Sequence, residues 1–148
     1  RAIRYNKKFI SDKRYISFKS LVSTGNIVNK DFAFYEVPFK YDVFDNKTFK
    51  ESKTSFYATV TNIENGEAEF IKIHDPYLQM ETLRATSALP FISEIIEVNG
   101  KKYLDGGIAN SIPIDFFEKK NYDKIIVILT RPITYRKKKS TSIQFKMF

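Results

Sequence analysis

The spacing of hydrophobic positions changes several times along the first half of the chain, and each change predicts an element. Apolar side chains recur at helical spacing over 14–24, and Gly25 supplies a stop. β-Branched and aromatic residues fill 54–62, which is typical of a strand. The alternating run 67–73 predicts a strand that returns from a turn at Asn65-Gly66. The pattern therefore predicts a short helix and then a β-hairpin.

Helix and strand patterns alternate again in the second half. A helix is predicted over 76–90, between two prolines, and a hairpin over 95–104. Ser111 and Pro113 are typical of the start of a helix that runs to about residue 120. The nearly continuous apolar run 124–130 predicts a strand buried on both faces, as in a parallel sheet covered by helices. This order favours a layered α/β domain with a mixed sheet.

The connection over 26–52 has no clear period. Its aromatic run 32–37 is followed by Pro38, and Asp45 is placed to cap a short helix that reaches Lys50. We expect the aromatic side chains to hold this long connection against the core. The alternative is that they form an apolar rim at a binding site.

The stretch Asp105-Gly106-Gly107 is the candidate for chemistry. A carboxylate there would lie on a sharp turn between a strand and a helix, where α/β proteins keep reactive groups. Gly106 and Gly107 would allow positive φ and the close approach of a backbone or a substrate. Two structural interpretations stand beside this one: Asp-Gly is an ordinary turn, and an aspartate can cap a following helix.

Composition limits the chemistry that is possible. The chain has 148 residues, 43% of them hydrophobic, which suits one domain or part of one with a real core. It has no cysteine, one histidine and no close cluster of carboxylates, so we expect no disulfide, no metal site and no cofactor. The lone His74 precedes Asp75-Pro76 and is interpreted as a turn residue. No apolar run is long enough for a membrane-spanning helix.

The net charge of +8 is concentrated towards both ends of the chain. Such charge favours anionic partners, either a membrane surface or nucleic acid, although charged ends are also simply well solvated. No nucleic-acid motif is present, so nucleic acid is not favoured. The lack of cysteine fits a cytoplasmic protein, which could contact a membrane peripherally, for example through the basic run Arg136–Lys139.

Several segments, taken in order, resemble those of bacterial patatin-like phospholipases. The run 83–91, Leu-Arg-Ala-Thr-Ser-Ala-Leu-Pro-Phe, is similar to the family's Ala-Ser-x-Ala-x-Pro helix. The hairpin 98–107 is similar to its segment ending in Asp-Gly-Gly, and 110–113 to its Asn-x-Pro. Further similar segments are 14–18, 25–26, 59–62, 65–67 and 122–131.

The resemblance implies a fold and a reaction. The fold is a three-layer, lysophospholipase-like α/β domain with a mixed, mainly parallel sheet flanked by helices. Residues 1–136 would be the C-terminal part of that domain, and 137–148 a basic tail or the start of a following segment. The reaction is hydrolysis of acyl esters of lipids, phospholipids included, by a Ser-Asp dyad. By the resemblance, Asp105 is the dyad's general base, and Gly106 and Gly107 form its supporting turn.

The chain departs from the family in lacking the nucleophile motif. None of its five glycines belongs to a Gly-x-Ser-x-Gly or to a glycine-rich oxyanion loop. The first residue is Arg1 rather than Met, and we interpret the chain as a fragment that begins after the nucleophile. We therefore expect it to be inactive alone. The alternative function is a non-catalytic basic module that binds anionic membrane surfaces or nucleic acid.

Overall fold

A computed structural model of the chain describes residues 2–136. Its residues form two compact units that meet in sequence between Pro113 and Ile114, and each unit is treated separately below. The basic segment 137–148, and with it most of the run Arg136–Lys139, lies outside the described residues.

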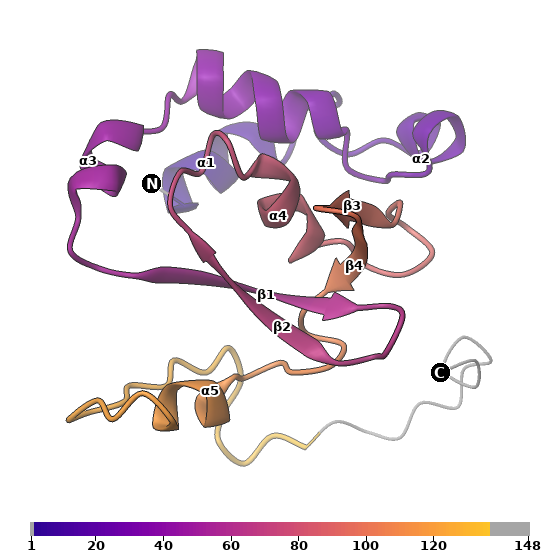
Figure 1. Cartoon of the computed structure of the whole chain (residues 1–148). Helices are drawn as coiled ribbons and strands as arrows, with labels where there is room; N and C mark the ends of the chain where they lie inside the picture. Colours follow the sequence, from indigo (N-terminus) through magenta and orange to yellow (C-terminus); the bar gives the residue numbers. More distant parts are fainter. Residues whose placement is uncertain (1, 137–148) are drawn as a thin grey trace. The chain divides into compact units, whose positions relative to one another are not determined.

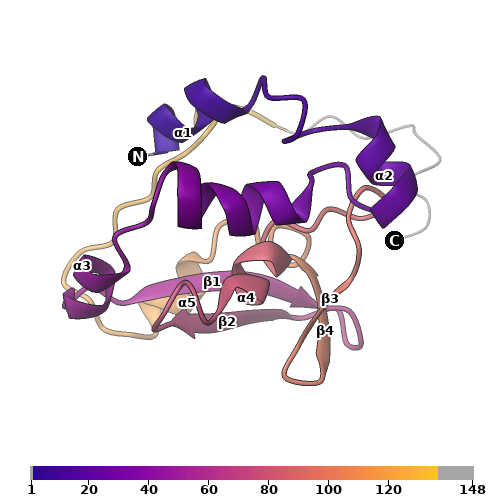
Figure 2. The same cartoon turned by 90° about the horizontal axis from the view of Figure 1, so that it is seen from above.

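The first unit contains a four-stranded sheet in the order β2-β1-β4-β3 (Figure 1). Its strands are β1 (Phe56–Asn62), β2 (Ala68–Ile73), β3 (Ile96–Val98) and β4 (Lys101–Asp105). All neighbouring strands are antiparallel, and Figure 2 shows β1 and β2 running side by side. Both predicted hairpins are confirmed.

The turn chemistry accounts for these hairpins. Asn99 and Gly100 have φ of 53° and 76°, the positive values that a tight two-residue hairpin turn requires. Gly66 likewise has φ of 74° in the turn between β1 and β2. A glycine adopts this conformation without the steric penalty of a side chain.

One helix covers one face of the sheet and closes the main core. In Figure 1, α4 (Met80–Ala85) lies between the sheet and the wide helix η1 (Asp31–Tyr41). The core is a cluster of five buried side chains from α4, from the loop that follows it and from the strands: Val60, Ala85, Ala88, Ile96 and Tyr103. The helix predicted over 76–90 is thus confirmed, but it is shorter than predicted, and turns lie on both sides of it.

The helix η1 is a π-helix where the sequence predicted an irregular connection. Proline interrupts an ordinary helix because it has no N–H to donate. In the i→i−5 pattern the partner of Pro38 would be the carbonyl oxygen of Ala33, and the Tyr5 hydroxyl donates to that oxygen at 2.8 Å. A side chain of α1 (Ala2–Phe9) therefore replaces the missing donor.

Two short helices complete the first unit. Ser17 caps α2 (Phe18–Thr24), where the predicted helix 14–24 begins later than expected. Asp45 caps α3 (Asn46–Glu51) by accepting a hydrogen bond from the Thr48 amide, as predicted.

The second unit contains α5 (Ile114–Glu118), which confirms the helix predicted after Pro113. The strand predicted over 124–130 is wrong, because this segment has no regular secondary structure, is exposed and belongs to no sheet. An apolar run indicates a tendency to be buried, but a strand also needs a neighbour to share its hydrogen bonds. No strand is described in 114–136 to act as that neighbour. The expected mainly parallel, three-layer arrangement is likewise not found, because the described strands are all antiparallel.

Candidate functional site

Asp105 is the last residue of β4, and its backbone is held from two sides. Its amide donates to the carbonyl oxygen of Ala88 at 2.9 Å. Its own carbonyl oxygen accepts a hydrogen bond from the Thr61 hydroxyl on β1 at 2.7 Å. These contacts fix the Cα position of Asp105 between the end of the α4 segment and the centre of the sheet.

The two oxygens of the Asp105 carboxylate have different surroundings. Oδ1 accepts a hydrogen bond from the Gly107 amide at 2.7 Å, so the side chain closes its own turn. Over residues 2–136, no protein hydrogen bond reaches Oδ2. The side chain is half-buried. One oxygen therefore orients the carboxylate, while the other remains able to accept a proton.

Gly106 allows the turn to lie directly against β1. A Cβ at this position would be 2.1 Å from the carbonyl oxygen of Thr59, which no side chain can tolerate. The close backbone approach predicted for this turn is confirmed at Gly106. The predicted positive φ is wrong, because neither Gly106 nor Gly107 has a positive φ.

The sheet register places the Asp105 side chain on the face that α4 covers. Asp105 pairs with Val60 across β4 and β1, and paired residues point to the same face. Val60 packs against Ala85 and Ala88 in the core. The carboxylate is therefore at the edge of the main core, beside the segment that follows α4.

A second carboxylate on the same face is fully occupied by structural contacts. Glu69 accepts hydrogen bonds from Asn62 at 2.9 Å, Tyr103 at 2.7 Å and Lys101 at 3.1 Å. The bonds from Asn62 and Tyr103 hold the pKa of Glu69 below its usual value. Burial, followed by the bond to Glu69, raises the pKa of Tyr103 to about 12. Glu69 therefore joins β2, β1 and β4 and has no spare capacity as a base.

The serine and histidine side chains near the turn are not paired with Asp105. Ser111 donates to the carbonyl oxygen of Gly107 at 2.7 Å, and Ser87 donates to that of Arg84 at 3.1 Å. His74 is an exposed residue in the turn before Pro76, as the sequence predicted. Between residues 2 and 136, no serine hydroxyl forms a hydrogen bond with the carboxylate of Asp105.

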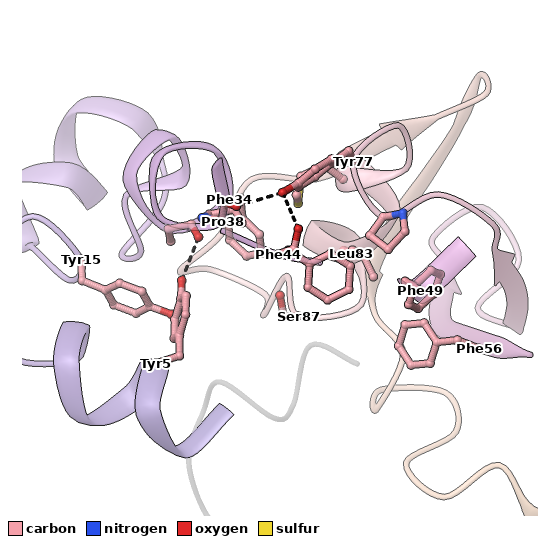
Figure 3. A pocket seen from close by; sticks show the side chains of 13 residues that line it. Tyr5, Tyr15, Phe34, Pro38, Phe44, Phe49, Phe56, Tyr77, Leu83 and Ser87 are labelled. Carbon is pink, nitrogen blue, oxygen red and sulfur yellow. Dashed lines mark hydrogen bonds between the residues drawn. The ribbon is translucent and has the colours of Figure 1, made fainter. Parts of the chain in front are cut away.

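An apolar cavity of about 630 Å³ lies between η1, α3 and α4 (Figure 3). Aromatic rings dominate its wall, including those of Phe34, Phe44 and Tyr77. The Tyr77 hydroxyl is satisfied within the wall, since it donates to the main-chain oxygens of Pro38 and Phe44 at 3.1 and 3.0 Å. Parts of the aromatic connection therefore fill the core, as Phe32 does, and other parts line this cavity.

The residues that fix Asp105 were not identified from the sequence. Thr59 and Thr61 belong to a run predicted as a strand, and Thr86 to a predicted helix. Both segments also resemble the family, but none of these three threonines was given a role. In the structure Thr61 holds the Asp105 carbonyl, and Thr86 donates to the Thr59 carbonyl oxygen at 2.6 Å. The signal that could have identified these residues is that each of the two segments that meet beside the glycine turn carries a threonine, whose hydroxyl can bond a main-chain oxygen.

Two further properties concern metals and membranes. Within residues 2–136, no three His, Asp or Glu side chains gather closely enough to hold a metal ion. None of the helices in that range is long and apolar enough to cross a membrane.

The comparison with protein families gives a clear assignment. The sequence model of the patatin-like phospholipase family matches residues 2–117, and the chain belongs to this family. Membership supports a lipid hydrolase in general terms. A search of curated proteins returned no match. A search of solved structures also returned no match.

Proposed function

We propose that residues 1–136 are the C-terminal part of a serine-type lipid acyl hydrolase domain in which Asp105 is the general base. The observation that carries this proposal is the asymmetry of the Asp105 carboxylate. Oδ1 is held by the Gly107 amide, and Oδ2 has no protein partner among the described residues. A base must be both oriented and free to accept a proton, and this carboxylate meets both conditions.

The mechanism would use the free oxygen twice. A serine hydroxyl within about 2.6–3.2 Å of Oδ2 would lose its proton as the oxygen attacks the ester carbonyl. The protonated carboxyl would return this proton to the leaving oxygen of the lipid alcohol, and the acyl group would remain on the serine. The regenerated carboxylate would next take a proton from water as the water oxygen attacks the acyl group, and would pass that proton to the serine oxygen as the fatty acid is released.

The nucleophile in this proposal lies outside the 148 residues. No Gly-x-Ser-x-Gly is present, and the hydroxyls of Ser87 and Ser111 donate to main-chain oxygens instead. The donors that stabilise the oxyanion would also come from outside, because no glycine-rich loop precedes Asp105.

The location of the nucleophile can be tested by labelling. A fluorophosphonate reacts with an activated serine, and peptide mass mapping identifies that serine. In a protein that carries this chain together with its nucleophile, we expect one labelled serine outside residues 1–148. A label on Ser87 or Ser111 would contradict the proposed division of the dyad.

A second, compatible function is peripheral contact with an anionic membrane surface. Phe18 and Val22 lie one turn apart on α2 and are 77% and 74% exposed. Lys13 and Lys19 line a small polar cleft next to this helix. Apolar side chains beside basic ones favour binding at the surface of an anionic bilayer. Co-sedimentation with phosphatidylserine vesicles that weakens as salt rises would support this function, and binding unaffected by salt would contradict it.

A further inference from the structure

We propose that the exposed apolar run 124–130 pairs with the same run of a second copy of this chain, as two antiparallel strands centred on Val127. The inference concerns how the chain associates, so it does not depend on the role of Asp105. Three observations carry it: the unpaired main chain of the run, the exposure of its side chains, and the order of the charges at its two ends.

The main chain of the run is available to form a β-ladder. Within residues 2–136, no hydrogen bond reaches the main chain of 124–130, and the run belongs to none of the four strands. It contains no proline, so each of its residues has an N–H to donate. A row of unpaired N–H and C=O groups is a template on which another strand can pair.

The exposure of the side chains alternates with the period of a strand. Ile126 and Ile128 are 87% and 89% exposed, whereas Val127 between them is 41% exposed. Successive side chains of a strand point to opposite faces, so Ile126 and Ile128 would share one apolar face. A bilayer could cover that face, but it offers no hydrogen bonds to the main chain. A second apolar strand provides both apolar contact and hydrogen bonds.

The sequence of the run complements itself in one antiparallel register. When the pair is centred on Val127, Asp123 of one copy lies opposite Arg131 of the other. Ile126 then lies opposite Ile128, and Val127 lies opposite itself. Opposite charges and β-branched side chains are favourable pairs across an antiparallel ladder. The arrangement is two-fold symmetric, so each favourable pair occurs on both sides of the centre.

The neighbouring registers and the parallel arrangement lack this match. A shift by one residue in one direction places Lys124 opposite Arg131, and a shift in the other direction places it opposite Leu129. Parallel strands in register would place Asp123 opposite Asp123 and Arg131 opposite Arg131. Like charges that face each other across a ladder are destabilising. The charges therefore favour the antiparallel register centred on Val127.

Single cysteines can report this register, because the chain has no cysteine of its own. In the proposed pair Val127→Cys lies opposite itself, at a separation that a disulfide can span. We expect oxidation of the purified 148-residue chain with this substitution to give a disulfide-linked dimer on a non-reducing gel. Ile133→Cys is the matched control, because Ile133 is 80% exposed and lies outside the run. Its yield of dimer should be at least fivefold lower.

A pair of cysteine variants distinguishes antiparallel from parallel strands. Ile125→Cys lies opposite Leu129 in the proposed register, and about 13 Å along the strand from Ile125 of the other copy. We therefore expect little disulfide from Ile125→Cys alone or from Leu129→Cys alone. A mixture of the two proteins should form a mixed dimer as readily as Val127→Cys forms its own.

The association itself is measured by sedimentation velocity of the unmodified chain over a range of concentrations. We expect a reversible equilibrium between monomer and dimer. Ile126→Lys places a charge on the apolar face and should weaken the dimer at least tenfold. Since Ile126 is exposed in the single chain, folding is not at risk, and circular dichroism should be unchanged. Ile133→Lys is the control and should dimerise within twofold of the unmodified chain.

Four outcomes would overturn the inference. A chain that stays monomeric at every concentration would show that the run does not pair. Equal yields of disulfide from Ile125→Cys and Val127→Cys would exclude the antiparallel register. Assemblies larger than dimers would indicate general aggregation of an apolar segment. Binding of a monomeric chain to phosphatidylserine vesicles, lost in the Ile126→Lys variant, would assign the face to a membrane instead.

Discussion

At Gly106 the backbone of the glycine turn touches the backbone of β1. The virtual Cβ lies 2.1 Å from the Thr59 carbonyl oxygen and 2.4 Å from the Thr59 carbonyl carbon. Both are main-chain atoms of a central strand, which cannot move without disturbing the ladder to β2 and β4. The absence of a side chain at this residue therefore sets the distance between the turn and the sheet.

We predict that Gly106→Ala destabilises the chain by about 1–3 kcal/mol, because the added methyl group forces the turn away from Thr59. Urea unfolding followed by circular dichroism measures this change. Gly107→Ala is the control, since Gly107 is exposed and its virtual Cβ meets only the Asp105 and Ser111 side chains. Its effect should stay within about 1 kcal/mol. Equal effects of the two variants would contradict the steric account.

The sequence predicted the position of Asp105 but not the residues that hold it. An aspartate after an apolar strand and before two glycines is a local pattern, readable along the chain. The hydrogen bond from Thr61 joins residues 44 positions apart and depends on the pairing of β1 with β4. Contacts of this kind follow from the register of a sheet, which a single sequence specifies only weakly.

At the scale of elements, an ionic cluster around Arg84 and Glu94 joins three segments of the first unit. Arg84 is buried in α4 and forms ion pairs with Glu81 of the same helix and with Glu94 before β3. Lys30, at the start of η1, also reaches Glu94 at 3.3 Å. Burial would raise the pKa of Glu94, but the hydrogen bonds from Arg84 and Lys30 outweigh it and lower this pKa.

We predict that Glu94→Gln lowers the free energy of unfolding at pH 7 by about 1–2 kcal/mol, a modest amount because one third of the carboxylate is exposed. A lowered pKa stabilises the fold above the ordinary carboxyl pKa of 4.5, and this contribution is lost as the pH falls through the lowered value. The difference between the two proteins should therefore shrink between pH 7 and pH 3. A difference that stays constant over this range would mean that charge is not the cause. Urea unfolding at several pH values measures the difference in unfolding free energy between the two proteins.

The elements themselves were predictable where local chemistry determines them. The hairpin turns and the cap at Asp45 follow from residues with special backbone or side-chain preferences. The helix η1 was missed because Pro38 normally ends a helix, and its compensation by Tyr5 comes from a residue distant in sequence. The run 124–130 was predicted as a strand because an apolar pattern does not reveal whether a partner strand is present.

At the scale of the whole molecule, the described residues hold a four-stranded antiparallel sheet and one proposed half of a catalytic dyad. We predict that the purified 148-residue chain does not hydrolyse a nitrophenyl acyl ester above the buffer rate, because its sequence contains neither a Gly-x-Ser-x-Gly nor a glycine-rich loop before Asp105. Release of nitrophenol, followed by absorbance, measures this rate. Turnover that scales with the concentration of the chain would show that the nucleophile is present within it.

Family membership was predictable from the order of short motifs, and the arrangement of the sheet was not. Each motif alone is a common turn or helix pattern, but together they indicated the family whose model matches residues 2–117, and the similar segment 122–131 lies outside that match. The expected parallel strands depend on partners for the run 124–130, and the second unit supplies none among its described residues. The sequence therefore did not predict how segments that are distant along the chain pair with one another.

The role of Asp105 as the base is tested most directly by one substitution in a protein that carries this chain with its nucleophile. Asp105→Asn keeps Oδ1 as an acceptor for the Gly107 amide and replaces the free Oδ2 with an amide group that cannot take a proton. We predict that kcat/KM for release of fatty acid from phospholipid falls by about 10²–10⁴-fold, with an unchanged unfolding transition. Asp123→Asn, at an exposed position in the second unit, should leave kcat/KM unchanged. Full activity of the Asp105→Asn protein would contradict the assignment of Asp105 as the base.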